Sequence, residues 1–152
     1  HIFSLQIMAI TYHTEQTGFA YKGRRLTSRW LGKVIEAEGG VLGEINIAFC
    51  SDDYMLQTNR QFLDHDYLTD IITFDYCQEH GGKRIISGDL AIGVDCVRDN
   101  AALFGTGFDR ELKRVIVHGV LHLLGYKDKK EAEQAVMRCK EDHYLCLLDN
   151  MA

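Results

Sequence analysis

The run VIVHGVLHLLGYKD (Val115–Asp128) decides the fold, because its first ten positions are almost wholly apolar. A helix that is apolar nearly all round must be buried, so we predict that a helix over Asp109–Leu124 is the central one of the molecule. His118 and His122 carry the only polar side chains in those ten positions. Each of these imidazoles needs a partner, because an unpaired buried polar group is costly.

Hydrophobic periodicity divides the rest of the chain into strands and helices, with glycine as the punctuation because proline is absent. Strands are expected at about Leu5–Tyr12, Glu44–Cys50, Asp70–Tyr76 and Arg84–Asp95. The last two strands are predicted to form a hairpin with a long polar loop that contains Gly81 and Gly82. Further helices are expected at Thr27–Glu38, from the cap Ser51 to Leu63, at Asp95–Phe104 and at Lys130–Leu148. This order predicts one α+β or mixed α/β domain over residues 1–152, with about five helices on a roughly four-stranded mixed sheet.

The composition is that of an ordinary globular protein, with 46% hydrophobic and 26% charged residues. No apolar run approaches the roughly 20 residues of a membrane span, and the N-terminus lacks the features of a secretory signal. We therefore expect a cytoplasmic protein with no membrane partner, and we expect Met8 to be the natural start, with residues 1–7 added ahead of it. The five cysteines form no C-x-x-C pair, which argues against a disulfide framework or a thiolate zinc site.

The formal net charge of −5 argues against a protein that coats nucleic acid, because such proteins are normally basic. Two short basic clusters remain candidates for a local patch: residues 22–29 (Lys22, Arg24, Arg25 and Arg29) and residues 110–114 (Arg110, Lys113 and Arg114). The alternative for each cluster is a solvated surface, and the sequence favours that alternative.

A candidate metal site lies at the end of the central helix. His118 and His122 are four residues apart, so both project from one helix face with Cβ atoms about 5–6 Å apart. Gly125 matches a helix-ending glycine in the left-handed conformation, which would turn the chain back and bring Asp128 to the same point. Two imidazoles and one carboxylate suit a catalytic zinc ion or another divalent transition metal. The residue pattern leaves open the alternative that the histidines are satisfied core residues.

Gly119 stands where zinc proteases of the H-E-x-x-H type carry a glutamate general base. It supplies no base, so chemistry of that type is disfavoured. Glycine costs about 1 kcal/mol relative to alanine inside a helix. We therefore expect that this position allows another element to approach the helix closely.

The segment HGVLHLLGYKD (His118–Asp128) closely resembles H-G-x-L-H-L-x-G-Y-D-H, the signature of the YbeY family of bacterial metal-dependent endoribonucleases. Three more segments are similar to family segments in the same order: LTDIITFDY (Leu68–Tyr76), SGDLAIGVDCVRDNA (Ser87–Ala101) and KKEAEQAVMRCKE (Lys129–Glu141). The resemblance implies an α+β fold with a zinc-type site at the edge of a cleft. It also implies a role in ribosomal RNA maturation, notably at the 3′ end of the small-subunit RNA, and in ribosome quality control.

The sequence departs from the family pattern at two positions. Position 128 carries aspartate where the family has its third histidine, so we expect an intact site with altered affinity or metal preference. In the N-x-x-[FY]-R segment, alignment of Asn59 and Phe62 puts Leu63 where the family supplies an arginine thought to meet the phosphate. This second departure bears on whether the chain cuts RNA at all.

Other residues are candidates for the site. Arg60 is the candidate for balancing charge on the phosphate, with Lys83–Arg84 behind it, and the alternative is exposed surface charge. Asp70, which with Thr69 matches a family segment beside the cleft, is either a catalytic residue or a turn residue at the strand entry. Asp89 is expected to make structural hydrogen bonds. The remaining histidines carry no site prediction: His13, His65, His80 and His143.

The predicted activity is metal-assisted hydrolysis of a phosphodiester in single-stranded RNA. Two alternatives stay open. One is a different zinc hydrolase, acting on a peptide or ester, which would need a general base near the motif. The other is a non-catalytic ribosome-assembly factor, in which the metal fastens the final loop to the central helix. Leu63 in place of the arginine favours this last alternative.

Overall fold

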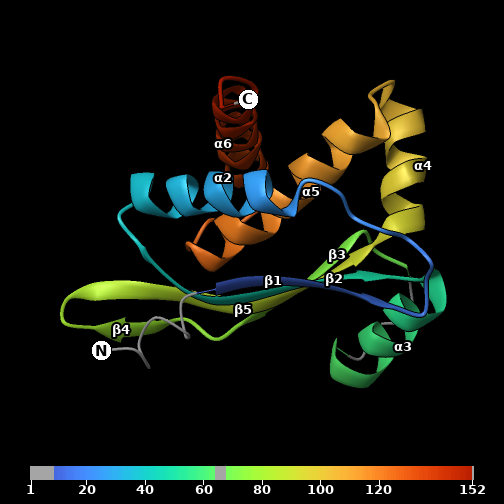
Figure 1. Ribbon diagram of the computed structural model, residues 1–152, viewed down its shortest axis with the longest axis horizontal. Coiled ribbons are helices and arrows are strands. Elements are labelled where there is room, and N and C mark those ends of the chain that lie inside the picture. The colour runs from blue at the N-terminus through green and yellow to red at the C-terminus, as the bar shows by residue number, and fades with distance from the viewer. Residues whose placement is uncertain (1–8, 64–67, 152) are drawn as a thin grey trace.

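The computed structural model describes residues 9–63 and 68–151, which form a sheet with helices against it. The helices α2, α5 and α6 cover one face of the sheet, and α3 lies at one end of the opposite face (Figure 1). Within the described ranges there are five helices: α2 (Arg24–Ala37), α3 (Asp52–Leu63), α4 (Val94–Phe104), α5 (Phe108–Leu123) and α6 (Glu131–Asp149). Each corresponds to a predicted helix, and no described helix is both long and apolar enough to cross a bilayer.

The sheet is mixed, with the order β1-β2-β5-β3 and a short fifth strand, β4, paired with β5. The strands are β1 (Ala9–Glu15), β2 (Val41–Cys50), β3 (Ile71–Asp75), β4 (Gln78–His80) and β5 (Lys83–Gly93). β1 and β5 run parallel to β2, whereas β3 and β4 run antiparallel to β5. The predicted α+β class and mixed sheet are confirmed. The part of the first predicted strand before Ala9, and residues 1–7 with Met8, lie outside the described residues.

β4 corrects the expected long loop between β3 and β5. His80 pairs with Lys83 across the turn, and Gly81 and Gly82 both have positive φ, 59° and 77°. Two successive residues of positive φ are what a type I′ hairpin turn requires, and glycine adopts them without strain. The two glycines therefore close a tight hairpin.

The end of β2 leads directly into α3. Ser51 precedes α3, and its Oγ accepts a hydrogen bond of 3.1 Å from the backbone N–H of Tyr54. This bond satisfies one of the N–H groups that have no partner within the first turn of a helix. The predicted cap at Ser51 is confirmed.

The central position predicted for α5 is confirmed. Val117, Val120 and Leu121 are fully buried and belong to the same core cluster as Leu90 of β5. Gly119 faces this contact, and a Cβ there would lie 2.7 Å from Cδ1 of Ile71 and 3.0 Å from Cδ2 of Leu90. The missing side chain therefore lets α5 lie close against β3 and β5, as expected from the sequence.

The basic cluster at residues 110–114 forms no open cationic patch. Arg110 lies 2.6 Å from a carboxylate oxygen of Asp149, and Lys113 lies 2.6 Å from one of Asp109. Arg114 is paired with Glu141 at 3.0 Å. The cations at residues 22–29 are exposed at the surface. All five cysteines are free thiols.

Candidate metal centre and its groove

The loop that follows α5 returns toward the helix because of the way in which the helix ends. Gly125 has a φ of 106°, and its N–H donates to the carbonyl of His122 at 3.0 Å. The N–H of Tyr126 donates to the carbonyl of Leu121, also at 3.0 Å. These two bonds define the Schellman motif, whose left-handed residue is normally glycine. The predicted reversal at Gly125 is confirmed, and it carries Asp128 back beside the helix.

Three donor atoms converge after this reversal. The Nε2 atoms of His118 and His122 lie 3.1 Å apart, and Oδ2 of Asp128 lies 3.2 Å and 3.3 Å from them. Donors bound to a tetrahedral zinc ion at about 2.0–2.2 Å are roughly 3.3–3.5 Å apart. The observed separations lie within about 0.2 Å of this range, so a divalent metal ion fits with a small outward shift of the side chains, and the donor types suit it. The side chains are 22%, 28% and 37% exposed, so the site is accessible from solvent.

Glu141 of α6 determines which nitrogen of His118 can bind an ion. Its Oε2 lies 2.6 Å from Nδ1 of His118. A carboxylate can only accept, so Nδ1 carries the hydrogen and donates it, and Nε2 keeps its lone pair for a metal. Burial lowers the pKa of His118, but the hydrogen bond to Glu141 and its charge raise it, and the net shift is upward.

Glu141 is itself paired with a cation, because a buried carboxylate is costly without one. It is only 4% exposed, and Nη1 of Arg114 donates to its Oε1 at 3.0 Å. Glu141 was missed in reasoning from the sequence. The sequence does contain a sign of its role: Glu141 lies at helical spacing from Met137 and Tyr144, on the buried face of α6. A carboxylate on a buried face needs a partner.

The donors line a groove of about 630 Å³ whose walls include α3, β3 and the loop after α5. The predicted pair Thr69 and Asp70 also lines this groove. Oδ2 of Asp70 accepts a hydrogen bond of 3.3 Å from Nδ2 of Asn100, and burial raises the pKa of this carboxyl group. The structure thus brings Asp70 into the same groove as His118.

The cations in and near the groove differ from those expected. Leu63 lines it, so the position at which the family resemblance places an arginine lies in the same groove as the donors. Arg60 is exposed and is not among the described lining residues, of which Lys129 is the only lysine or arginine. Arg84 donates from Nε and Nη2 to the carbonyl of Leu123, at 3.3 Å and 3.2 Å, and so caps the end of α5. Reasoning from the sequence missed Lys129.

The other residues considered lie away from the donors. Asp89 makes the expected structural hydrogen bond, because its Oδ1 accepts one of 2.9 Å from Nδ2 of Asn46. Several further side chains are exposed: His13, His80, Lys83 and His143. His65 lies outside the described residues.

The fold and the three converging donors define the class of this protein: an α+β protein with a candidate metal centre at the end of its central helix. A family model described as Endoribonuclease YbeY matches residues 10–149. Endoribonuclease YbeY of Bacteroides thetaiotaomicron is 49% identical over 140 residues, which cover 92% of this chain and 99% of that protein. The same-named protein of Phocaeicola vulgatus is 48% identical over 91% of this chain and 98% of its own length.

The fold has a solved counterpart as well. The solution structure of TM1509 from Thermotoga maritima matches with a TM-score of 0.63 and 26% identity, over 92% of this chain and 89% of that one. The chain therefore belongs to the endoribonuclease YbeY family. The resemblance seen in the His118–Asp128 segment is confirmed.

Proposed function

We propose that this chain is a metal-dependent endoribonuclease that cuts single-stranded RNA in ribosomal RNA maturation, with zinc as its ion. One observation carries the proposal: three donor atoms converge in a groove of about 630 Å³, in a chain of the YbeY family. We further propose the 3′ end of the small-subunit RNA as the substrate and ribosome quality control as part of the role. Both come from the family resemblance.

Each residue has a distinct part in this proposal. His118, His122 and Asp128 hold the ion, which when bound supplies a Lewis acid for a phosphoryl oxygen and lowers the pKa of its water. Asp70 lines the same groove and would orient the attacking water molecule by accepting a hydrogen bond from it. Lys129 balances the negative charge that develops on the phosphate.

A cleavage assay tests the proposal. Labelled single-stranded RNA is incubated with zinc-loaded protein, with protein stripped by a chelator and with His122→Ala. Cleavage is expected only for the first, and Lys129→Ala is expected to slow it. The matched controls are His143→Ala, which removes an exposed imidazole from α6, and Lys127→Ala, which removes an exposed amine outside the groove lining. Cleavage that survives at full rate in both His122→Ala and the stripped protein would contradict the proposal.

Leu63 favours a second candidate, a non-catalytic ribosome-assembly factor in which the metal fastens the final loop to α5. This side chain faces the groove where an arginine would meet the phosphate. The candidate predicts stoichiometric metal with no RNA cleavage over a range of divalent ions. Leu63→Arg separates the two functions further, because an endoribonuclease limited by this leucine should gain rate when the cation is restored.

A further inference from the structure

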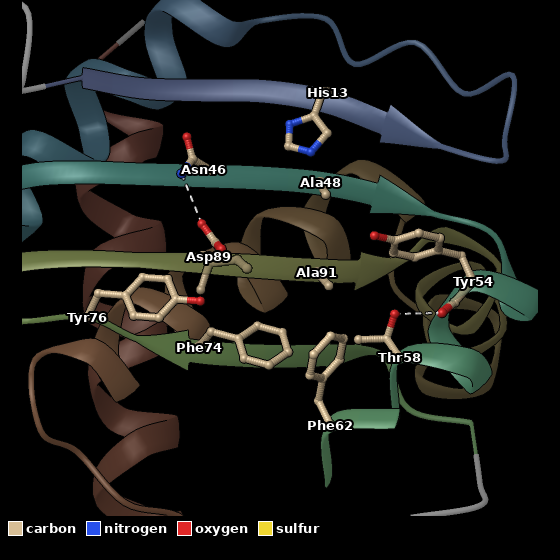
Figure 2. A pocket seen from close by; sticks show the side chains of 11 residues that line it. His13, Asn46, Ala48, Tyr54, Thr58, Phe62, Phe74, Tyr76, Asp89 and Ala91 are labelled. Carbon is tan, nitrogen blue, oxygen red and sulfur yellow. Dashed lines mark hydrogen bonds between the residues drawn. The ribbon is translucent and has the colours of Figure 1, made fainter. Parts of the chain in front are cut away.

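A second hollow lies on the face of the sheet opposite α5 (Figure 2). Its volume is about 390 Å³, within the range of small-ligand sites. The methyl groups of Ala48 and Ala91, neighbours on β2 and β5, leave room for it beside α3. We call this hollow the sheet-face pocket and define it by six of its lining residues: Ala48, Phe62, Phe74, Tyr76, Asp89 and Ala91.

A row of polar side chains crosses the sheet at the rim of this pocket. Thr11, Asn46 and Asp89 are register neighbours on β1, β2 and β5, and Phe74 of β3 completes the row. The hydroxyl of Thr11 donates to Oδ1 of Asn46, whose Nδ2 donates to Oδ1 of Asp89 at 2.9 Å. Within the described part of the chain, this is the only hydrogen bond to the carboxylate of Asp89. Asp89 is therefore held in a fixed orientation with acceptor capacity to spare.

Aromatic rings line the pocket together with this acceptor, among them Phe62, Phe74 and Tyr76. Phe62 is 61% exposed and Tyr76 is 57% exposed. Phe62 meets Phe74 edge to face at 5.8 Å, and Tyr76 lies beside Asp89 (Figure 2). Proteins commonly bind unpaired bases with an exposed aromatic ring beside a hydrogen-bonding group. The base stacks on the ring and forms hydrogen bonds through its edge.

The pocket and the metal groove lie on the two sides of β3, at the edge of the sheet. Side chains alternate between the faces of β3, so that Thr73 lines the groove and Phe74 lines the pocket. On α3, Leu63 lines the groove and its neighbour Phe62 lines the pocket. Because β3 is the last strand on its side of the sheet, a single strand separates the two hollows. A nucleotide chain that crosses β3 can reach both.

We propose that the sheet-face pocket holds an unpaired nucleobase of the RNA strand that is cut in the metal groove. This inference rests on the proposed function. The base stacks on Phe62 or Tyr76 and donates from its edge to the carboxylate of Asp89. Guanine is the best match, because it presents two neighbouring N–H donors and a carboxylate only accepts. The same carboxylate repels a phosphate, so the pocket selects the base over the backbone.

Binding measurements test the proposal. The His122→Ala background prevents cleavage under the proposed function, and fluorescence anisotropy follows two short single-stranded RNAs. One has a single guanosine among uridines, and the other is abasic at that position. The guanosine RNA is expected to bind more tightly. Loss of the ring on which the base stacks, by Phe62→Ala or Tyr76→Ala, should weaken its binding by about fivefold to 150-fold, the range for loss of one base–aromatic stack. Asp89→Asn should remove most of the difference between the two RNAs.

Matched controls come from α4, none of whose residues lines the pocket or the metal groove. Phe104→Ala removes a ring that is 57% exposed, and Asp99→Asn removes an exposed carboxylate. Both are expected to bind as the parent does. Thermal unfolding midpoints equal to the parent's would show that the pocket variants are folded.

The possible outcomes separate the two proposals. If wild-type protein cuts RNA but Phe62→Ala, Tyr76→Ala and Asp89→Asn bind both RNAs as the parent does, the pocket proposal is wrong and the proposed function stands. If the variants lose both RNAs equally, the pocket contributes to binding without holding a base, and the proposal is again wrong. If wild-type protein neither binds nor cuts RNA, both proposals fail together.

Discussion

The hydroxyl group of Tyr126 donates a hydrogen bond of 2.6 Å to Oε1 of Glu38, across 88 residues of sequence. Glu38 directly follows α2, and Tyr126 belongs to the loop that carries Asp128. Oε2 of Glu38 accepts from Nζ of Lys140 at 3.0 Å and from the hydroxyl of Tyr144, both on α6. One carboxylate therefore fastens the loop of the candidate metal centre to two helices.

This cluster predicts a pH-dependent loss of stability in Glu38→Gln. Burial raises the pKa of Glu38. The hydrogen bonds from Tyr126, Tyr144 and Lys140 together lower it by a larger amount, so the net shift is downward from 4.5. A pKa that is lower in the folded state means that the carboxylate stabilises the fold above pH 4.5, and that this stability is lost as pH falls through the folded value. Glu38→Gln should lower the free energy of unfolding by about 1–3 kcal/mol near neutral pH.

Urea denaturation across a pH series measures this effect. The difference between wild type and Glu38→Gln should shrink as the pH falls below 4.5. Glu36→Gln, an exposed acid on the same helix, is the control and should change little. A constant difference at all pH values would mean that the charge of Glu38 is not what matters.

Glu141→Gln should weaken metal binding, although Glu141 is not itself one of the three proposed ligands. The carboxylate fixes the hydrogen of His118 on Nδ1, and loss of such a partner typically costs about 10–100-fold in metal affinity. Competition with a chromophoric zinc chelator measures the affinity. Asp142→Asn is the matched control, because Asp142 also contacts Arg114, at 2.9 Å, but is not the partner of His118. Equal affinity in both variants would rule out the role given to Glu141.

Zinc should raise the thermal stability of the wild-type protein. An ion that binds only the folded state contributes about 2.7 kcal/mol when its free concentration is a hundred times its Kd. The shift in unfolding midpoint should vanish in His122→Ala, shrink in Asp128→Ala and persist in Asp128→His. His143→Ala should respond as wild type does. No shift in the wild type would mean that His118, His122 and Asp128 do not hold zinc and that the two histidines have a structural role.

Gly88 should tolerate no side chain. A Cβ there would lie 2.4 Å from the backbone oxygen of Phe74 and 2.8 Å from Cδ2 of Leu123, so β5, β3 and α5 would have to move apart. Gly88→Ala is expected to lower the free energy of unfolding by about 1–3 kcal/mol or more. In Gly32→Ala, inside α2, the new Cβ meets nothing within 4 Å, and a gain of up to about 1 kcal/mol is expected. Chemical denaturation of the two variants measures the loss expected for Gly88→Ala and the gain expected for Gly32→Ala. A Gly88→Ala protein as stable as the wild type would show that the strands can move apart without cost.

Much of the fold follows from patterns that are local in the sequence. The helices, the strand cores and the cap at Ser51 were predictable because each depends on neighbours a few residues away. β4 was not predictable, because Gln78–His80 is polar and exposed on both sides and shows no hydrophobic alternation. Only its pairing with β5 makes this segment a strand, and that pairing depends on where the turn at Gly81 and Gly82 returns the chain.

The sequence by itself determined that two imidazoles share one face of the central helix and that Gly125 returns Asp128 toward them. Those features rest on hydrogen bonds and spacings within one or two helical turns. Only the tertiary structure decided that Glu141 meets His118 across 23 residues and that Asn46 meets Asp89 across 43. The physical reason is that such contacts depend on how α6 packs on α5 and on the register of β2 with β5. No pattern that is local in the sequence determines that packing or that register.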